Sequence, residues 1–248
     1  MQTETTKEIV LQVSKLKKRF GNNIVLDDFS FELHRNENIV VLGKSGSGKS
    51  VLIKCIIGLM KPEDGSIIIL GKEVNEMNAE ELDKTRAKIG FLFQSNALYD
   101  SMTVRENLEF PLRRHWIKHK KEEINQIINQ ALSDVKLTHT IDMMPSELSG
   151  GMRKRIALAR TLILKPEIIL YDEPTTGLDP ITAKEIIQLI IEIKNKYNTA
   201  SLIISHDMNC VKLASDLVVM LIDGKCYAND TYSNLKNSQD KNIKQFFE

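Results

Sequence analysis

The chain has 248 residues, 42% of them hydrophobic and 27% charged, which is enough to bury a sizeable core without disulfides or a structural metal. Its 34 lysines and arginines nearly balance its 33 aspartates and glutamates, so the net charge gives no support to a nucleic-acid partner. No apolar run approaches the roughly 18 residues of a membrane-spanning helix, and residues 1–6 lack the basic and apolar parts of an export signal. We therefore expect one cytoplasmic unit, with Cys55, Cys210 and Cys226 as reduced thiols because they lie far apart in the sequence.

The first part of the chain is predicted to form an antiparallel hairpin. Apolar and polar residues alternate from Ile9 to Leu16 and from Ile24 to Leu33, the pattern of strands with one buried face. The segment Gly21-Asn22-Asn23 between them supplies the turn.

A buried strand and a phosphate-binding loop come next. The run from Ile39 to Leu42 is short and uniformly apolar, as in a parallel sheet covered on both faces. The following eight residues fit the pattern G-x-x-x-x-G-K-[ST] and lead into the apolar-rich segment Val51 to Met60, which completes the expected strand, loop and helix. Backbone N–H groups of such a loop bind the α- and β-phosphates of a nucleotide, Lys49 reaches the β- and γ-phosphates, and the Ser50 hydroxyl takes a Mg²⁺ position; a flexible glycine-serine loop is the alternative. The loop consists of Gly43, Lys44, Ser45, Gly46, Ser47, Gly48, Lys49 and Ser50.

The pattern changes between Gln94 and Gly150, where we predict an inserted helical lobe. Within it, the basic run from Arg113 to Lys121 invites an anionic-lipid or nucleic-acid interpretation, but a solvated helix entrance is favoured. The apolar residues that recur at helical spacing are Ile124, Ile127, Ile128, Ala131, Leu132 and Val135.

Two carboxylates follow the next apolar run, Ile168 to Tyr171, which we assign to the same parallel sheet. Adjacent carboxylates repel each other, so the pair Asp172-Glu173 needs an explanation. We interpret Asp172 as a Mg²⁺ ligand acting through water, and Glu173 as the general base that deprotonates the attacking water. A helix cap with a solvated neighbour is the alternative.

Two further polar residues belong to the same sheet edge, because parallel strands deliver their carboxyl ends to one side. His206 follows the buried run Leu202 to Ile204 and could touch the γ-phosphate and hold the attacking water. Gln94 follows Phe91-Leu92-Phe93 and would complete the Mg²⁺ and water shell. A purely structural histidine is the alternative for His206. The core is thus predicted to be α/β, and Leu217 to Ala228 adds a final hairpin around Asp223-Gly224.

A second phosphate-seeking element stands at Leu148-Ser149-Gly150-Gly151-Met152, where two glycines open a predicted helix. Within one chain it is redundant, since the loop at 43–50 already holds a nucleotide. These residues resemble the signature motif of ABC transporter ATPases. The order of elements resembles that family throughout: the phosphate loop, Gln94, the signature, Asp172-Glu173, a Gly177-Leu178-Asp179 turn similar to the family's D-loop, and His206.

The resemblance implies an α/β P-loop NTPase core of RecA-like type, with an N-terminal antiparallel β subdomain and an α-helical subdomain inserted at about residues 95–150 of a single nucleotide-binding domain, 1–248. It implies ATP and Mg²⁺ as ligands and a head-to-tail dimer with a second copy of the chain. In that dimer Ser149, Gly150 and Gly151 would bind the γ-phosphate held by the partner, and Asp179 would belong to the nucleotide site. Phe20 matches the aromatic position on which the family stacks adenine; a hairpin core residue is the alternative.

One branch of the family is indicated more closely. Met152 replaces the glutamine usual after the signature glycines and is followed by three basic residues, which resembles the Mla/Mce-type phospholipid transport ATPases. The resemblance implies phospholipid transport through a separate integral membrane permease, at the cytoplasmic face of the membrane, with additional lipid-binding subunits. We expect Ala97-Leu98-Tyr99 to dock the permease, with core packing as the alternative. The other segments that resemble the branch are Phe91 to Val104, Glu106 to Leu108, Phe110 to Arg113 and Ile243 to Phe247.

Rival functions are an ATPase of an ABC importer for a small solute and an ABC ATPase that acts without a permease in translation or DNA repair. Proteins of the second kind usually fuse two such domains or insert a long coiled coil, and this sequence shows neither. A nucleotide-binding regulator without turnover is opposed by the presence of both Glu173 and His206. The sequence therefore favours a transport ATPase.

Overall fold

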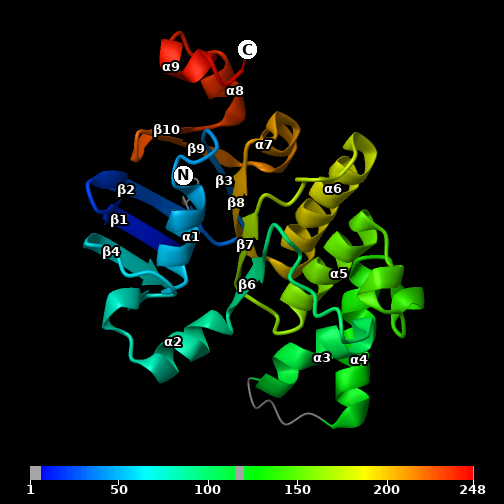
Figure 1. Cartoon of the computed structure of the whole chain (residues 1–248). Helices are drawn as coiled ribbons and strands as arrows, with labels where there is room; N and C mark the ends of the chain where they lie inside the picture. Colours follow the sequence, from blue (N-terminus) through cyan, green and yellow to red (C-terminus); the bar gives the residue numbers. More distant parts are fainter. Residues whose placement is uncertain (1–6, 115–119, 248) are drawn as a thin grey trace, which may run out of the picture.

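The structure is a computed structural model that describes residues 7–114 and 120–247 (Figure 1). The start of the chain, examined above for an export signal, and the centre of the basic run lie outside the described residues. Two sheets and their covering helices give the α/β architecture predicted from the sequence. The six-stranded sheet has the order β10-β9-β3-β8-β7-β6, and the four-stranded sheet has the order β2-β1-β4-β5.

The central sheet confirms the predicted buried parallel strands. β3 (Asn38–Leu42) pairs in parallel with β8 (Ala200–Ser205) and β9 (Leu217–Ile222), while β7 (Ile168–Asp172) pairs in parallel with β8 and β6 (Ile89–Leu92). Alternate residues of each strand face opposite sides, as strand geometry requires. Ile39 and Val41 belong to one hydrophobic core, and Val40 and Leu42 to the other, so uniformly apolar runs serve both faces.

The predicted N-terminal hairpin is present and longer than expected. β1 (Ile9–Phe20) pairs with β2 (Asn23–His34), and β4 (Asp64–Ile69) then pairs with the other edge of β1, with β5 (Lys72–Glu73) beyond it. This sheet and α1 (Lys49–Ile56) cover one face of the central sheet, as Figure 1 shows. The short helix α2 (Ala79–Arg86) begins with a capping box between Asn78 and Glu81.

Helices cover the other face of the central sheet (Figure 1). The predicted helical lobe contains α3 (Val104–Arg114), α4 (Lys121–Asp134) and the 3₁₀ turns Thr138–Thr140 and Pro145–Glu147. α5 (Gly150–Leu162), α6 (Pro180–Tyr197) and α7 (Met208–Ala214) continue this layer and share its core. Within the described ranges, no helix is long and apolar enough to cross a membrane.

The end of the chain forms the predicted hairpin and two short helices. β9 and β10 (Lys225–Asp230) meet at Asp223-Gly224, whose φ angles of 50° and 78° are the left-handed pair that a tight hairpin turn needs. α8 (Tyr232–Lys236) and α9 (Lys241–Lys244) then return toward the phosphate loop, where the Lys44 Nζ donates to the Gln245 Oε1 at 3.2 Å.

Candidate nucleotide site

The candidate site lies at one edge of the central sheet, where four parallel strands end. β3 leads into residues 43–48, β6 is followed by Gln94, β7 ends in Asp172 and Glu173, and β8 is followed by His206. The sheet topology therefore brings together the groups that the sequence analysis placed at a common edge.

Neighbouring atoms closely surround two glycines of the phosphate loop, Gly43 and Gly48. Gly48 has a φ of 103°, and a Cβ added there would lie 2.6 Å from the Val25 Cγ1, so only glycine fits between the loop and the N-terminal hairpin. A Cβ at Gly43 would lie 2.6 Å from the Ser47 Oγ, which is buried and has no hydrogen-bond partner within the described residues. A buried hydroxyl of this kind calls for a polar ligand, and a phosphate oxygen supplies one.

Lys49 is held inside this loop. Its Nζ donates to the carbonyl oxygens of Gly43 at 2.7 Å and Lys44 at 3.0 Å, and it lies 4.0 Å from the Glu173 Oε1. Burial lowers the pKa of the Lys49 amine, partly offset by the nearby carboxylates. A desolvated cation beside backbone N–H groups is suited to binding an anion.

Glu173, the predicted general base, contacts His206, which is predicted to hold the attacking water. Its backbone has a φ of 50° and its N–H donates to the Ile204 carbonyl at 2.9 Å, which turns the side chain out of the sheet edge. The Glu173 Oε2 lies 2.9 Å from the His206 Nδ1 and accepts from the Thr176 Oγ1 at 3.4 Å. The Glu173 side chain is nearly buried, whereas the His206 side chain is exposed, so the carboxylate is shielded while the imidazole faces the solvent.

Asp172 ends β7 and is partly buried. Burial raises the pKa of its carboxyl group, and the neighbouring Glu173 raises it further, while Lys49, Lys54 and Lys154 act in the opposite direction. Carboxylate and hydroxyl oxygens are the ligands that Mg²⁺ takes from proteins, so Asp172 and Ser50 have the right chemistry for the predicted metal.

Gln94 leaves the sheet at the end of β6 with an exposed residue surface. Its carbonyl oxygen accepts a hydrogen bond of 3.0 Å from the Nζ of Lys154, a residue of α5. In the sequence, Lys154 is recognisable only as one of three basic residues after Met152, and its contact with Gln94 was not predicted. The helical spacing within α5 was the available signal, because Lys154 lies on the same side as the buried Ala157 and Leu158.

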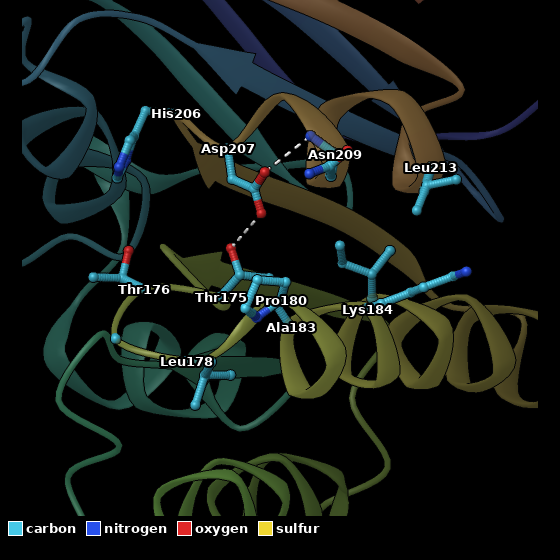
Figure 2. A pocket seen from close by; sticks show the side chains of 12 residues that line it. Thr175, Thr176, Leu178, Pro180, Ala183, Lys184, His206, Asp207, Asn209 and Leu213 are labelled. Carbon is cyan, nitrogen blue, oxygen red and sulfur yellow. Dashed lines mark hydrogen bonds between the residues drawn. The ribbon is translucent and has the colours of Figure 1, made fainter.

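Two hollows flank the sheet edge. One, of about 550 Å³, is lined by residues 44–47 of the phosphate loop, by Ile24 and Val25 and by the C-terminal segment. The other, of about 580 Å³, runs between the start of α6 and α7 (Figure 2). Figure 2 shows His206 and Thr176 at the same end of this second hollow, with Asp207 accepting from the Thr175 Oγ1 at 3.0 Å.

The predicted signature residues begin α5. The Ser149 Oγ accepts from the Met152 N–H at 3.2 Å and caps the helix. Around Gly150 there is open space, with no heavy atom within 4 Å of an added Cβ, whereas a Cβ at Gly151 would lie 2.6 Å from the Thr182 Cγ2. Within the described residues, no hydrogen bond or ion pair joins these signature residues to the phosphate loop.

Asp179 and Phe20 are the remaining predicted site residues. The Asp179 carboxylate caps α6, accepting from the N–H groups of Ile181 and Thr182 and from the Thr182 Oγ1, and these bonds lower its pKa. Phe20 ends β1 with 48% of its surface exposed and the Lys18 Nζ 5.5 Å from its ring centroid. Its hairpin approaches the phosphate loop through Val25.

Comparison with known proteins decides the family. The family profile for ABC transporters matches residues 26–176, which is more than half of the chain. This chain is an ABC transporter ATPase.

Relatives of this ABC ATPase differ in the transport that their names state. It is 40% identical over 238 residues to the probable ribonucleotide transport ATP-binding protein mkl of Mycobacterium leprae, covering 96% of this chain and 68% of that protein. Over the same length it is 36% identical to the intermembrane phospholipid transport system ATP-binding protein MlaF of Haemophilus influenzae, covering 89% of that protein. It is 35% identical to the glutamate/glutamine/aspartate/asparagine transport ATP-binding protein BztD of Rhodobacter capsulatus, covering 98% of this chain and 92% of that protein.

Solved structures agree with the fold. The dimeric post-hydrolysis state of the ATP-binding cassette MJ0796, bound to ADP and Pi, matches with a TM-score of 0.80 at 30% identity, covering 89% of this chain and 98% of that one. The structure of cbiO1 from Clostridium perfringens, part of the ABC transporter complex cbiONQ, matches with a TM-score of 0.83 at 28% identity, covering 91% and 89%. The ABC ATPase therefore has the P-loop NTPase fold predicted from its sequence, and its reaction is ATP hydrolysis.

Proposed function

We propose that this ABC ATPase, acting over residues 1–248 as one nucleotide-binding domain with a helical part at about 95–150, drives a membrane permease by ATP-dependent closure of two copies. Two observations carry the proposal. Glu173 lies within 4.0 Å of both Lys49 and His206 at the sheet edge, and the signature residues at the start of α5 make no hydrogen bond or ion pair to the phosphate loop within the described residues.

We assign the following roles to the site residues. The loop Gly43–Ser50 cradles the phosphates, Lys49 pairs with the β- and γ-phosphates, and Phe20 stacks on the adenine. Glu173 accepts the proton of the attacking water, and His206, 2.9 Å from it, holds that water against the γ-phosphate. Ser50, Gln94 and Asp172 would hold Mg²⁺, which would neutralise negative charge on the phosphates.

The signature residues complete the site of a second copy. Ser149, Gly150 and Gly151 present backbone N–H groups at the start of α5, an anion-binding arrangement, and Gly150 has room around it for an approaching phosphate. Asp179, by capping α6, fixes the turn at the dimer interface. The dimer reported for MJ0796 supports this assignment.

A permease would dock beside the loop that carries Gln94. There, a groove of about 320 Å³ lies between α1, α2 and β6, with Leu59 and Phe93 in its wall. Leu59 is 63% exposed and Phe93 is 40% exposed, whereas Leu98 is partly buried against the main core. The proposed docking surface therefore moves from Ala97-Leu98-Tyr99, predicted from the sequence, to the groove that contains Leu59 and Phe93. Docking there places the ABC ATPase at the cytoplasmic face of the membrane.

Changing Leu59 to Asp should abolish permease binding while leaving the isolated subunit folded. The side chain is exposed in the free chain, so the carboxylate costs nothing there, but burying it in an apolar contact costs several kcal/mol, about a hundredfold or more in affinity. Co-purification of the subunit with its permease measures the loss. Leu213→Asp, a similarly apolar and exposed site on α7, is the matched control and should assemble normally. Normal assembly of the Leu59→Asp variant with the permease would refute the proposed docking surface.

The transported molecule is a phospholipid or a related lipid. The resemblance of residues 151–155 to the Mla/Mce branch and the similarity to MlaF support this choice, and additional lipid-binding subunits would accompany the permease. An importer for a small solute is the second candidate, favoured by the similarity to BztD. Reconstituted complex should transfer labelled phospholipid between membranes only with ATP. Recovery of the subunit with an amino-acid permease would refute the lipid assignment and leave the ATPase intact.

A further inference from the structure

Lys154 of α5 is a buried lysine between the helical layer and the sheet edge that carries Asp172 and Glu173. Lys154 is 1% exposed, and its Nζ donates a hydrogen bond of 3.0 Å to the Gln94 carbonyl. Burying a charged amine is costly unless it is paired or hydrogen-bonded, so the chain retains this group against a free-energy penalty. An apolar residue at this helix position would pack without that penalty.

The surroundings of Lys154 connect three parts of the site. The residue lies one turn beyond Ser149, which caps α5. The positive charge of Lys154 acts on the Asp172 carboxylate together with those of Lys49 and Lys54 of α1, and all three oppose the rise in the pKa of Asp172 that burial causes, so α5 contributes its own cation to the electrostatics of this carboxylate. Burial lowers the pKa of Lys154 to about 8, and Asp172 acts against that shift.

The same helix holds the rest of the loop that begins at Gln94. Arg160 donates to the Ala97 carbonyl at 2.8 Å and to the Asn96 carbonyl at 3.3 Å. Asn96 and Ala97 have φ angles of 65° and 51°, so the loop adopts a conformation that L-residues rarely take and that external contacts must maintain. Lys154 supplies the contact at the functional end of the loop.

We infer that Lys154 is a positioning residue for ATP hydrolysis: it fixes Gln94 to the start of α5, so that the loop bearing Gln94 and the helix bearing Ser149 move as one unit against Asp172. The inference rests on the proposed role of Gln94 in the metal shell. Loss of the hydrogen bond would leave Gln94 free to move relative to Asp172 while the fold of both elements remains.

The test compares Lys154→Met with Lys154→Gln. Both variants remove the positive charge near Asp172, but glutamine keeps an N–H donor and methionine does not, so their difference isolates the hydrogen bond. In the nucleotide-free chain, amide exchange of residues 94–99 should be about tenfold faster in Lys154→Met than in Lys154→Gln. At saturating AMP-PNP, the dissociation constant of Mn²⁺, measured by electron paramagnetic resonance, should be about fivefold or more higher in Lys154→Met. Equal exchange and equal Mn²⁺ affinity in the two variants would overturn the inference.

Controls separate this inference from the proposal on which it rests. Arg155→Gln changes the next residue, which pairs with Glu185 of α6 at 2.6 Å, and it should leave loop exchange and Mn²⁺ affinity unchanged. If Gln94→Ala binds Mn²⁺ like the parent, the metal role of Gln94 fails, while the exchange comparison still tests the Lys154 contact. Lys154→Leu replaces Lys154→Met as the variant without a donor if the latter does not fold.

Discussion

Glu173→Gln should lower ATP turnover by at least about a hundredfold while ATP still binds. The amide retains the size of the carboxylate and can still hydrogen-bond to His206, which lies 2.9 Å from the Glu173 Oε2, but it cannot accept the proton of the attacking water. Nothing in the phosphate loop changes, because Lys49 is also held by the carbonyls of Gly43 and Lys44. Phosphate release under saturating ATP measures turnover, and equilibrium binding of a fluorescent ATP analogue measures affinity.

The blocked variant also tests the shared site. With hydrolysis stopped, the closed pair of chains should accumulate in ATP and be visible as a dimer by light scattering. Adding Gly150→Asp should abolish that dimer, because a carboxylate would then face the partner's γ-phosphate. No heavy atom lies within 4 Å of a Cβ added at Gly150, so the second substitution should not disturb the fold of one chain.

Two results would contradict these assignments in different ways. Parent-like turnover by Glu173→Gln would show that another group removes the proton. A Glu173→Gln protein that remains monomeric at high ATP, even with its permease, would count against completion of the site by the signature of a second copy. Loss of folding in either variant is excluded by measuring its free energy of unfolding.

The sheet edge could be predicted from the sequence because the patterns that specify its strands are local. Each short apolar run specifies a strand buried on both faces, and parallel strands must end together, so Asp172, Glu173 and His206 could be placed at one edge without any structure. The contact of 2.9 Å between Glu173 and His206 was not predicted, since it depends on the φ of 50° at Glu173. The roles of these residues remain predictions.

Contacts between segments that lie far apart in the sequence could not be predicted. The three basic residues after Met152 were interpreted only as a feature of the Mla/Mce branch, yet one of them, Lys154, is almost fully buried and donates to the Gln94 carbonyl. β4 was missed because its alternation is broken by Gly65 and Ser66, and it becomes a strand by pairing with β1. Leu98, predicted at an interface, is partly buried because the helical layer closes over it.

The phosphate loop offers the most direct test of nucleotide binding. The Lys49 amine donates to two backbone carbonyls, and burial lowers its pKa, so desolvation disfavours its positive charge and a phosphate anion would offset that cost. The Ser47 hydroxyl of the same loop is buried and has no hydrogen-bond partner among the residues that the structure describes. Binding of a phosphate would therefore give a partner to two buried groups, the Lys49 amine and the Ser47 hydroxyl. Most of the gain in binding free energy comes from the charged amine.

Lys49→Ala should weaken ATP binding by about 1.5–3 kcal/mol, which corresponds to roughly a 10- to 150-fold rise in the dissociation constant. The substitution removes the charge-assisted contact to the β- and γ-phosphates and leaves the backbone N–H groups of the loop in place, so binding is reduced rather than abolished. Isothermal titration with ATP measures the change, and Lys61→Ala, an exposed lysine beyond α1, is the matched control that should bind like the parent. The Lys49→Ala chain should remain folded, because alanine is a strong helix former at the first position of α1 and removal of a buried amine relieves its desolvation. Equal affinity in a folded Lys49→Ala variant would overturn the assignment of residues 43–50 as the phosphate cradle, because no other cation in contact with that loop is buried within the described part of the chain.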